Sequence, residues 1–594
     1  MKVYTVNATC ELAELAAKLS GGDPLQKRII FCEDKFTLEL EIALSKRYGG
    51  TFGTRVFSFN RFMHKYLPES FEVLSPESAA LVVKRLLLEN KGRLTCIKNV
   101  YDPNLAGVVY ELIAQLKSAK ICPEDLRRAA EGSSGILRRK LDDIYVIFDE
   151  YEKFVGENKL TDGNNRLSRL PAFFAECDDI KQSDVIVAGF PSLNRTLCEI
   201  FKSLNKNAKS LTFALVAGEN KGVYTNETFD FAMREFNCEH IAVNGDETRA
   251  RLLNTLYSPG KKGSFCSDVH VYRAQNTTEE VEYIARLIAS GVRNNEGAGR
   301  FYKDYAVCTE DISSYALTIK RIFADYGIPF FIDQSDDLGK HPLTTLVGAY
   351  IDVLRRGFSI DDYLRFVKNP LICADKSLSD GFENYVLKHA IDRKSIHKEF
   401  VCEEDGVEDF EKLRAFSVAL FSLMPEREKG GVVSFSDAVR AIENLLEQID
   451  AKSRLEDLGD ELKNIGSAGL AEYNAQAYDK FCGVLTAAEK ILGDKLLPLV
   501  EVKNVIVSGM TACKISIIQE YSDCVFVGDF RAVKYKKYPV LFALGLSDGV
   551  PSTKFDSALL CDRDIVGMEA FDVSVEPKIK EVNRRNRENA CMAL

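Results

Sequence analysis

The sequence predicts an α/β protein with two parallel-sheet cores, each interrupted by a mainly helical insertion. Short apolar runs of strand type alternate with amphipathic helical stretches, the order typical of βαβ units and parallel sheets. Helical patterns alone dominate from about residue 75 to 165 and again from His341 to about residue 500. The chain has 594 residues, more than one hydrophobic core usually supports, so several domains are expected.

The first core is predicted from five elements near the N-terminus. Strand-like runs cover Val3–Val6, Lys27–Cys32 and Arg55–Phe59, with helical patterns at Lys35–Tyr48 and Asn60–Tyr66. The helical insertion then begins at Ser75-Pro76, a favourable N-cap and first-turn pair. One buried helix face in it carries Leu141, Ile144, Phe148, Tyr151 and Val155. Strand-like runs return at Asp184–Phe190 and Leu211–Val216, which completes the first core.

The second core is predicted from an alternation that begins near residue 268. Strands are expected at His270–Tyr272, Tyr305–Cys308 and Phe330–Ile332. A helix follows the first strand, and Thr277 stands three residues before Glu280, which is a capping-box spacing. The next helix is expected to end at Gly327. Two further strand-like runs, Asp523–Val527 and Val540–Leu544, follow the second helical stretch.

These elements predict four structural units. Residues 1–70 with 166–265 form the first core, and residues 266–342 with 505–594 form the second core. The two helical insertions are residues 71–165 and 343–504.

Composition indicates a folded, cytoplasmic protein without structural metal. It is 46% hydrophobic and 28% charged, which argues against disorder. No run of about 18 apolar residues and no signal-peptide pattern occurs, so no membrane segment is expected. The 16 cysteines lack CxxC pairs and the six histidines lack metal-ligand spacing, which favours reduced thiols. The net charge of −10 argues against a generally basic nucleic-acid coat but leaves room for a local basic groove.

The order of elements resembles the UvrD type of superfamily 1 helicases, in which helical domains 1B and 2B interrupt the RecA-like cores 1A and 2A. More closely, the chain resembles the AddB (or RexB) subunit of bacterial AddAB-type helicase–nucleases. The segments that carry this resemblance are RIIFCEDKFTLELEIAL, RVFSFNRF, DVIVAGFPSLNRTLCEIFKSL, DYAVCTEDISSYALTIKRIFADYGIPFFI and GLSDGVPS. Their order and spacing together, rather than one motif, support it.

The positions that handle nucleotide in motor relatives are altered here. Those proteins need a glycine-rich loop ending in Gly-Lys-Ser/Thr, but the first strand leads into NATCELAEL, and no GxxxxGK[ST] occurs in the sequence. Motor relatives place acidic residues where this chain has Ala188-Gly189, and an arginine where it has Glu310. The three losses predict a scaffold that does not hydrolyse ATP, with no intact nucleotide-binding residue and no catalytic residue.

The resemblance implies a non-motor subunit of a helicase–exonuclease that processes DNA double-strand breaks for recombination and guides single-stranded DNA. The implied partners are single- and double-stranded DNA and an AddA-type subunit in a heterodimer. Family members carry Mg²⁺ and a 4Fe-4S cluster in a C-terminal nuclease region that this sequence does not include, so no cofactor is expected and the chain is expected to be a fragment or a short homologue. The alternatives are an autonomous ATPase or nuclease and a stand-alone DNA- or protein-binding module.

One segment imitates a PD-(D/E)xK nuclease site. Asp494 followed by Glu501-Val502-Lys503 has the spacing of the metal-binding motif, and LVEVKNVIV has a strand-like pattern. The segment precedes the last core strands, far from where the family's nuclease region begins. A solvated charge alternation is therefore the preferred interpretation.

Three groups of residues are candidates for contact with DNA. Ser58, Phe59 and Arg61 lie where relatives pass single-stranded DNA, although a core strand with a capping Ser58 or Asn60 is an alternative. The loop with Gly545, Ser547, Asp548 and Gly549 follows a buried strand and could equally be a plain turn. Lys534 stands in a basic run with Lys536 and Lys537, which indicates either phosphate contact or a solvated edge.

Overall fold

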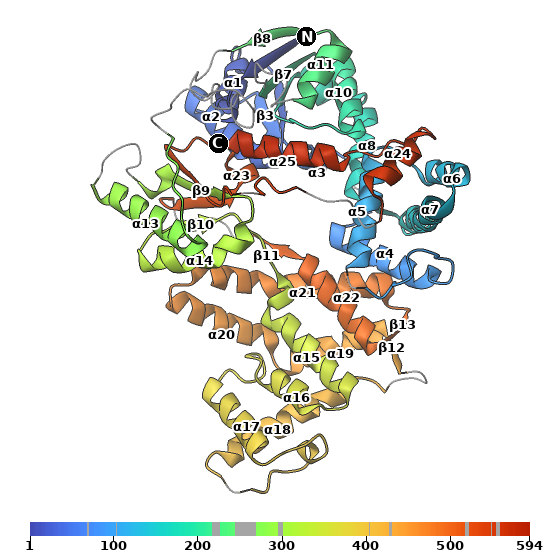
Figure 1. The fold of residues 1–594 in the computed structure, drawn as a ribbon, viewed down its shortest axis with the longest axis vertical. Coiled ribbons are helices and arrows are strands. Elements are labelled where there is room, and N and C mark those ends of the chain that lie inside the picture. The colour runs from blue at the N-terminus through green and yellow to red at the C-terminus, as the bar shows by residue number, and fades with distance from the viewer. Residues whose placement is uncertain are drawn as a thin grey trace.

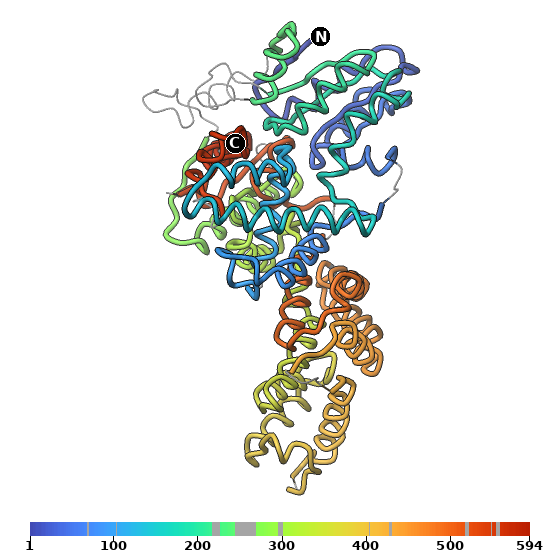
Figure 2. Tube along the Cα trace, turned by 90° about the vertical axis from the view of Figure 1, so that its right-hand side faces the viewer, coloured from blue at the N-terminus to red at the C-terminus, as the bar shows by residue number. Residues whose placement is uncertain are grey.

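The computed structural model describes residues 1–67, 71–102, 104–216, 226–243, 269–294, 301–402, 404–426, 431–516, 522–547, 549–553 and 559–593. Two parallel sheets occupy one end of the molecule, and helices form a long arm at the other (Figure 1). In the view turned by 90°, the helices between residues 342 and 512 extend away from both sheets (Figure 2). The predicted α/β class, with two parallel-sheet cores and helical insertions, is confirmed.

The first sheet has six strands in the order β3-β2-β6-β7-β1-β8, and all neighbours pair in parallel. The strands are β1 (Lys2–Val6), β2 (Arg28–Cys32), β3 (Thr54–Phe57), β6 (Asp184–Ala188), β7 (Ser210–Val216) and β8 (Glu239–Ala242). Every residue of β2 is buried, as expected for a central strand covered by helices on both faces.

Alternation along these strands supplies both faces of the first core. Ile29 and Phe31 face one helical layer, whereas Ile30 and Cys32 face the other. The first layer contains α3 (Phe59–Tyr66), α8 (Gly163–Phe174), α10 (Arg195–Asn207) and α11 (Glu227–Phe236). The second layer contains α1 (Leu12–Leu19) and α2 (Thr37–Tyr48).

The second sheet has four parallel strands in the order β10-β15-β9-β16. They are β9 (Tyr305–Thr309), β10 (Phe330–Ile332), β15 (Val525–Asp529) and β16 (Val540–Ala543). Helices α13 (Thr277–Asn294) and α14 (Ile312–Asp325) cover one face, and α23 (Phe530–Val533) and α25 (Ile579–Ala593) cover the other.

The first insertion is helical, as predicted. It contains α4 (Pro76–Asn90), α5 (Leu105–Ser118), α6 (Pro123–Gly132), α7 (Gly135–Glu157) and the short parallel pair β4 (Glu72–Val73) and β5 (Leu160–Thr161). The Ser75 side chain caps α4 by accepting a hydrogen bond from the Ser78 N–H. The short helix α9 (Asp178–Gln182) then leads into β6.

The second insertion shares its hydrophobic core with the first. Its helices are α15 (Pro342–Arg356), α16 (Ile360–Val367), α17 (Lys376–Lys388), α18 (Val407–Ala419), α19 (Phe435–Gln448), α20 (Ala451–Asn464), α21 (Ala468–Leu492) and α22 (Leu499–Ala512). One continuous cluster of buried side chains joins these helices to α4, α5 and α7, because α4 packs against both α21 and α22. A last short helix, α24 (Asp562–Glu569), also packs on this cluster.

Three local predictions were wrong. His270–Tyr272 is not a strand, since these residues are exposed and form no backbone ladder with any strand in the described part of the chain. The cap of α13 is shifted by one residue, because the Asn276 side chain accepts from the Glu279 N–H and Glu279 accepts from the Gln275 N–H. The segment LVEVKNVIV forms the first part of α22 rather than a strand.

Across the described ranges, no helix combines the length and apolar character needed to cross a lipid bilayer.

Candidate functional site

The end of β1 is where a phosphate-binding loop would lie, and the chain closes this position with its own residues. After Val6 the backbone passes through a short 3-10 turn, Thr9–Glu11, directly into α1. The Thr9 hydroxyl donates a hydrogen bond of 2.9 Å to the Met592 carbonyl oxygen of α25. Met592 is also part of the buried cluster formed by α1, α2 and the first sheet. A residue of α25 therefore occupies the space beside β1.

The loop after α23, in the second core, also contacts the first core near the end of β1. The Lys534 ammonium lies 3.0 Å from a Glu33 carboxylate oxygen, and the Tyr535 hydroxyl donates to Glu33 at 2.6 Å. The Tyr535 ring stacks on Phe36 with centroids 4.2 Å apart. Glu33 and Phe36 follow β2, so these contacts join the carboxyl edge of the first sheet to the second core. Both aromatic rings are buried.

The cavity that remains is too small for a nucleotide. It measures about 90 Å³ and is lined by Ala8, Thr9 and Cys10 on one side and by Lys534 and Cys591 among the residues opposite. Small-molecule sites span roughly 300–1,000 Å³. A wider groove of about 600 Å³ lies beside it, between α1 and α2 on one side and residues 535–539 of the second core on the other. It shares Cys10 and Tyr538 with the small cavity, but its lining does not include Ala8 or Thr9. The position that would cradle phosphate is thus filled.

Ala188 and Gly189 offer no metal ligand at the end of β6. Ala188 is fully buried, and Gly189 has φ +89° and donates its N–H to the Ala214 carbonyl. A Cβ at Gly189 would lie 3.2 Å from the Tyr535 hydroxyl oxygen, so the close approach of the second core also favours glycine here.

The Glu310 side chain binds a loop of the second core. Its carboxylate accepts hydrogen bonds from the Ser552 N–H at 2.7 and 2.8 Å and from the Ser552 hydroxyl at 2.7 Å. The side chain that replaces the arginine of motor relatives therefore fixes the segment that follows Gly549.

The candidates at α3 divide into buried and exposed residues. Ser58 is buried and caps α3 by accepting a 3.2 Å hydrogen bond from the Arg61 N–H, so the predicted capping role is confirmed. Phe59 is buried and stacks on Phe31, with centroids 4.8 Å apart, which leaves no free ring face for a base. The Arg61 guanidinium is 57% exposed and lies 3.6 Å from Glu41. Of the three, only Arg61 presents a polar group to solvent.

The loop after β16 depends on its glycines. Gly545 has φ +69°, and its N–H donates to Glu280 at 2.8 Å. Tyr315 donates to the same carboxylate, and its hydroxyl would lie 3.0 Å from a Cβ at position 545. Ser547 donates its N–H to the Gly545 carbonyl, and Gly549 has φ +97°. Asp548 lies outside the described residues.

The basic run is not a solvated edge. Lys534 is only 6% exposed and is paired with Glu33, and Lys536 packs on the Phe526 ring at 4.0 Å. Burial lowers the pKa of the Lys536 ammonium. Only Lys537 is exposed. The burial of Lys534 could not be predicted from the sequence, because its partner Glu33 is about 500 positions away in the chain.

The imitation nuclease motif does not assemble. Asp494 pairs with Arg85 at 2.9 Å, Glu501 lies 3.3 Å from Lys84, and Lys503 donates to Asp352. Each of the three residues thus has its own partner. Glu501 is buried, so the preferred solvated charge alternation was wrong as well. Among the residues whose placement is described, no group of three or more His, Cys, Asp or Glu side chains could hold a metal ion.

The fold and this site define a protein with two parallel-sheet cores that contact each other at the end of β1. Comparison with known proteins narrows the class. Residues 9–257 match the model of the family described as "ADDB, N-terminal". The chain is similar to proteins named as the B subunit of an ATP-dependent helicase/deoxyribonuclease, and the predicted resemblance to AddB-type proteins is confirmed.

Three of these relatives illustrate the match. The identity is 24% to the proteins of Listeria monocytogenes and Bacillus subtilis, over 93% of this chain and 52% of each relative. It is 25% to the protein of Pelotomaculum thermopropionicum, over 94% of this chain and 52% of the relative. The chain spans about half the length of the curated relatives it matches.

Proposed function

We propose that the chain is the non-motor, helicase-like subunit of a cytoplasmic helicase–exonuclease complex that processes DNA double-strand breaks for recombinational repair. The single observation that carries this proposal is the filled position at the end of β1, where a motor would hold phosphate. A motor couples movement of two cores to nucleotide held between them. Here Met592 and Lys534 lie against Ala8 and Thr9 at the end of β1, and the cavity left at that position measures about 90 Å³.

The ATP-driven step therefore belongs to a partner, for which an AddA-type motor subunit in a heterodimer is the proposed candidate. The relatives are named as one lettered subunit of a helicase/deoxyribonuclease, which supports the existence of another. This chain's share is to guide single-stranded DNA. We propose that residues 1–594 themselves hold no metal or cluster, because the family they resemble carries Mg²⁺ and the iron–sulfur cluster in its C-terminal nuclease region.

The proposed DNA path crosses the carboxyl edges of both sheets. Arg61 lies in α3, directly after β3, and the Gly545–Gly549 loop directly follows β16. Open α/β sheets bind ligands beyond the carboxyl ends of their strands. The exposed guanidinium of Arg61 is the group proposed to contact a phosphate on the first core. Lys534 does not belong to this path, because it is buried in the contact between the cores.

The test is ATP turnover by the purified chain, with and without single-stranded DNA and with and without the partner. We expect none from the chain alone, and no nucleotide binding at millimolar concentration. The partner's turnover should be unchanged when Thr9→Ala is introduced into this chain. DNA-stimulated turnover above about 1 s⁻¹ by the chain alone, in the range of ordinary enzymes, would refute the proposal once a contaminating motor has been excluded.

A further inference from the structure

Helix α25 contacts both cores. It lies between the two sheets in Figure 1, drawn in red. Ala590 packs with Ala306 and Cys308 of β9, in the second core. Two residues further along, Met592 packs with Leu12 and other side chains of the first core. The same turn of α25 is thus part of two hydrophobic cores.

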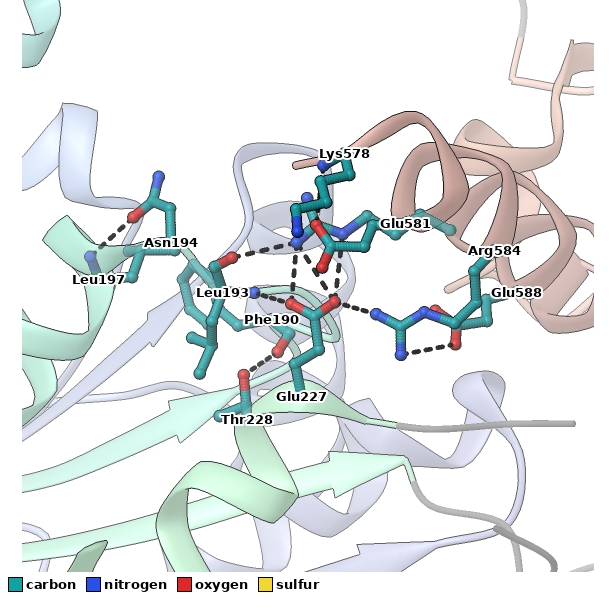
Figure 3. A network of polar contacts seen from close by, with 11 residues as sticks. Phe190, Leu193, Asn194, Leu197, Glu227, Thr228, Lys578, Glu581, Arg584 and Glu588 are labelled. Carbon is teal, nitrogen blue, oxygen red and sulfur yellow. Dashed lines mark hydrogen bonds and ion pairs between the residues drawn. The ribbon is translucent and has the colours of Figure 1, made fainter. Parts of the chain in front are cut away.

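The middle of α25 is held to the first core by one carboxylate. Glu227, the first residue of α11, accepts hydrogen bonds from the guanidinium groups of Arg584 and Arg585. Figure 3 shows the Arg584 side chain pointing toward the Glu227 carboxylate. The Arg585 contact is 2.9 Å long, and Arg585 also donates to the Leu193 carbonyl at 3.1 Å. The Leu193 N–H donates to Glu227 at 2.7 Å. These four residues form the Glu227 clamp.

The Glu227 clamp is partly shielded from water. The side chains of Glu227, Arg584 and Arg585 are 21%, 32% and 22% exposed. Ion pairs with hydrogen-bonded, planar guanidinium geometry are stronger than isolated surface pairs. Arg585 bridges two separate segments of the first core, the loop after β6 and the start of α11, which fixes the direction of α25 as well as its position.

We infer that α25 is a strap that holds the two cores in one relative position. Hinge closure around a ligand requires the facing surfaces of two domains to separate and approach. Separation here would expose Met592, break the hydrogen bond from Thr9, and leave Glu227 facing Leu193 without its arginines. Because α25 packs on the second sheet through Ala590 and is held to the first core through Arg584, Arg585 and Met592, rotation of one core against the other would have to break one of these sets of contacts.

The distance between the cores tests the strap directly. Exposed Leu38 on α2 and exposed Leu317 on α14 are positions for a pair of spin labels carried on unnatural side chains. In the full chain we expect a single narrow distance distribution that ATP does not change. The variant Arg584→Ala/Arg585→Ala should broaden it. Arg587→Ala, on the exposed face of the same helix, is the matched control and should leave it narrow.

Hydrogen exchange in the same samples shows whether the variant is folded. In Arg584→Ala/Arg585→Ala, amides of α25 should exchange about tenfold faster or more, whereas those of β2 and β9 stay protected. Glu227→Lys should behave like the arginine variant, and adding Arg585→Glu should restore part of the protection. A broad distribution in the unmodified chain, or a narrow one in the double variant, overturns the inference. If the double variant fails to fold, Glu227→Lys and its rescue decide.

Discussion

Glu501 offers a sharp test of how the two insertions are joined. Its carboxylate lies 3.3 Å from the Lys84 ammonium, and the two side chains are 4% and 6% exposed. Lys84 also donates to the Val100 carbonyl at 2.9 Å. The Glu501 Oε2 atom is close enough for an ion pair but accepts no hydrogen bond among the described residues, so the alignment is poor. The pair links α4 to α22 within the shared core.

Removing one partner of a buried pair typically costs about 3–5 kcal/mol. The Val100 contact keeps the Lys84 ammonium partly satisfied, so Glu501→Ala should cost about 3 kcal/mol, at the lower end of that range. In contrast, Lys84→Met/Glu501→Leu replaces both charges by apolar groups of similar size and should lie within about 1 kcal/mol of the unmodified chain or be more stable. Glu501→Gln should fall between them.

Native-state hydrogen exchange is the suitable assay because a chain with several domains does not unfold in one step. A loss of 3 kcal/mol corresponds to about 150-fold faster exchange through local opening, which should appear in α4 and α22 but not in β2. Exchange in Glu501→Ala within about twofold of the unmodified chain would refute the reasoning. Metal-dependent nuclease activity that Glu501→Ala abolishes without any change in exchange would instead revive the nuclease interpretation.

Three further predictions concern other parts of the chain. Burial lowers the pKa of His341 to about 4, so the folded protein keeps the imidazole neutral. The stabilisation that depends on neutral His341 is complete above the ordinary pKa of 6.5 and is lost as the pH falls from 6.5 toward 4. The local stability of α15 should therefore drop by about 2 kcal/mol between pH 7 and 5, and His341→Asn should flatten this dependence in exchange measurements. Asp143 is buried and accepts from the N–H groups of Thr95, Cys96 and Ile97. Asp143→Asn should destabilise that loop by about 2 kcal/mol, and unchanged exchange of these three amides would contradict this. Arg61→Ala should weaken single-stranded DNA binding about equally for all sequences and lower the salt slope by about one; an unchanged slope in a salt titration would place the DNA elsewhere.

The central strands could be predicted from sequence because their cause is local. RIIFC and YAVCT are short, fully buried apolar runs, which a parallel sheet covered by helices on both faces requires. The segment LVEVKNVIV has a strand-like pattern because its β-branched residues alternate with polar ones, yet it is helical. In the folded chain Val502, Val505 and Ile506 lie on one helical face, and packing against α4 and α21 decides the outcome.

The site at the end of β1 could be predicted from the sequence only in part. The missing Gly-Lys-Ser/Thr loop is visible in the sequence, but what fills its place is not. Thr9 contacts Met592, Glu33 contacts Lys534, and Glu227 contacts Arg585, and the two residues of each pair are more than 350 positions apart in the sequence. Nothing in the local pattern around these residues marks them as partners. Single arginines and glutamates on amphipathic helices are common on solvated faces.

The shared hydrophobic core of the two insertions has a consequence for the newly made chain. Helix α4 ends at Asn90, whereas α22, which covers it, begins at Leu499. Helices α5 and α7 also pack on α4 and are made soon after it. Ribosomes add about 5–20 residues per second, so the part of α4 that packs against α22 stays uncovered for roughly 20–80 s. During that interval Leu81, Val82 and their neighbours are available to bind a chaperone or another nascent chain. The order of synthesis, rather than the final packing, sets when this protein is most prone to aggregate.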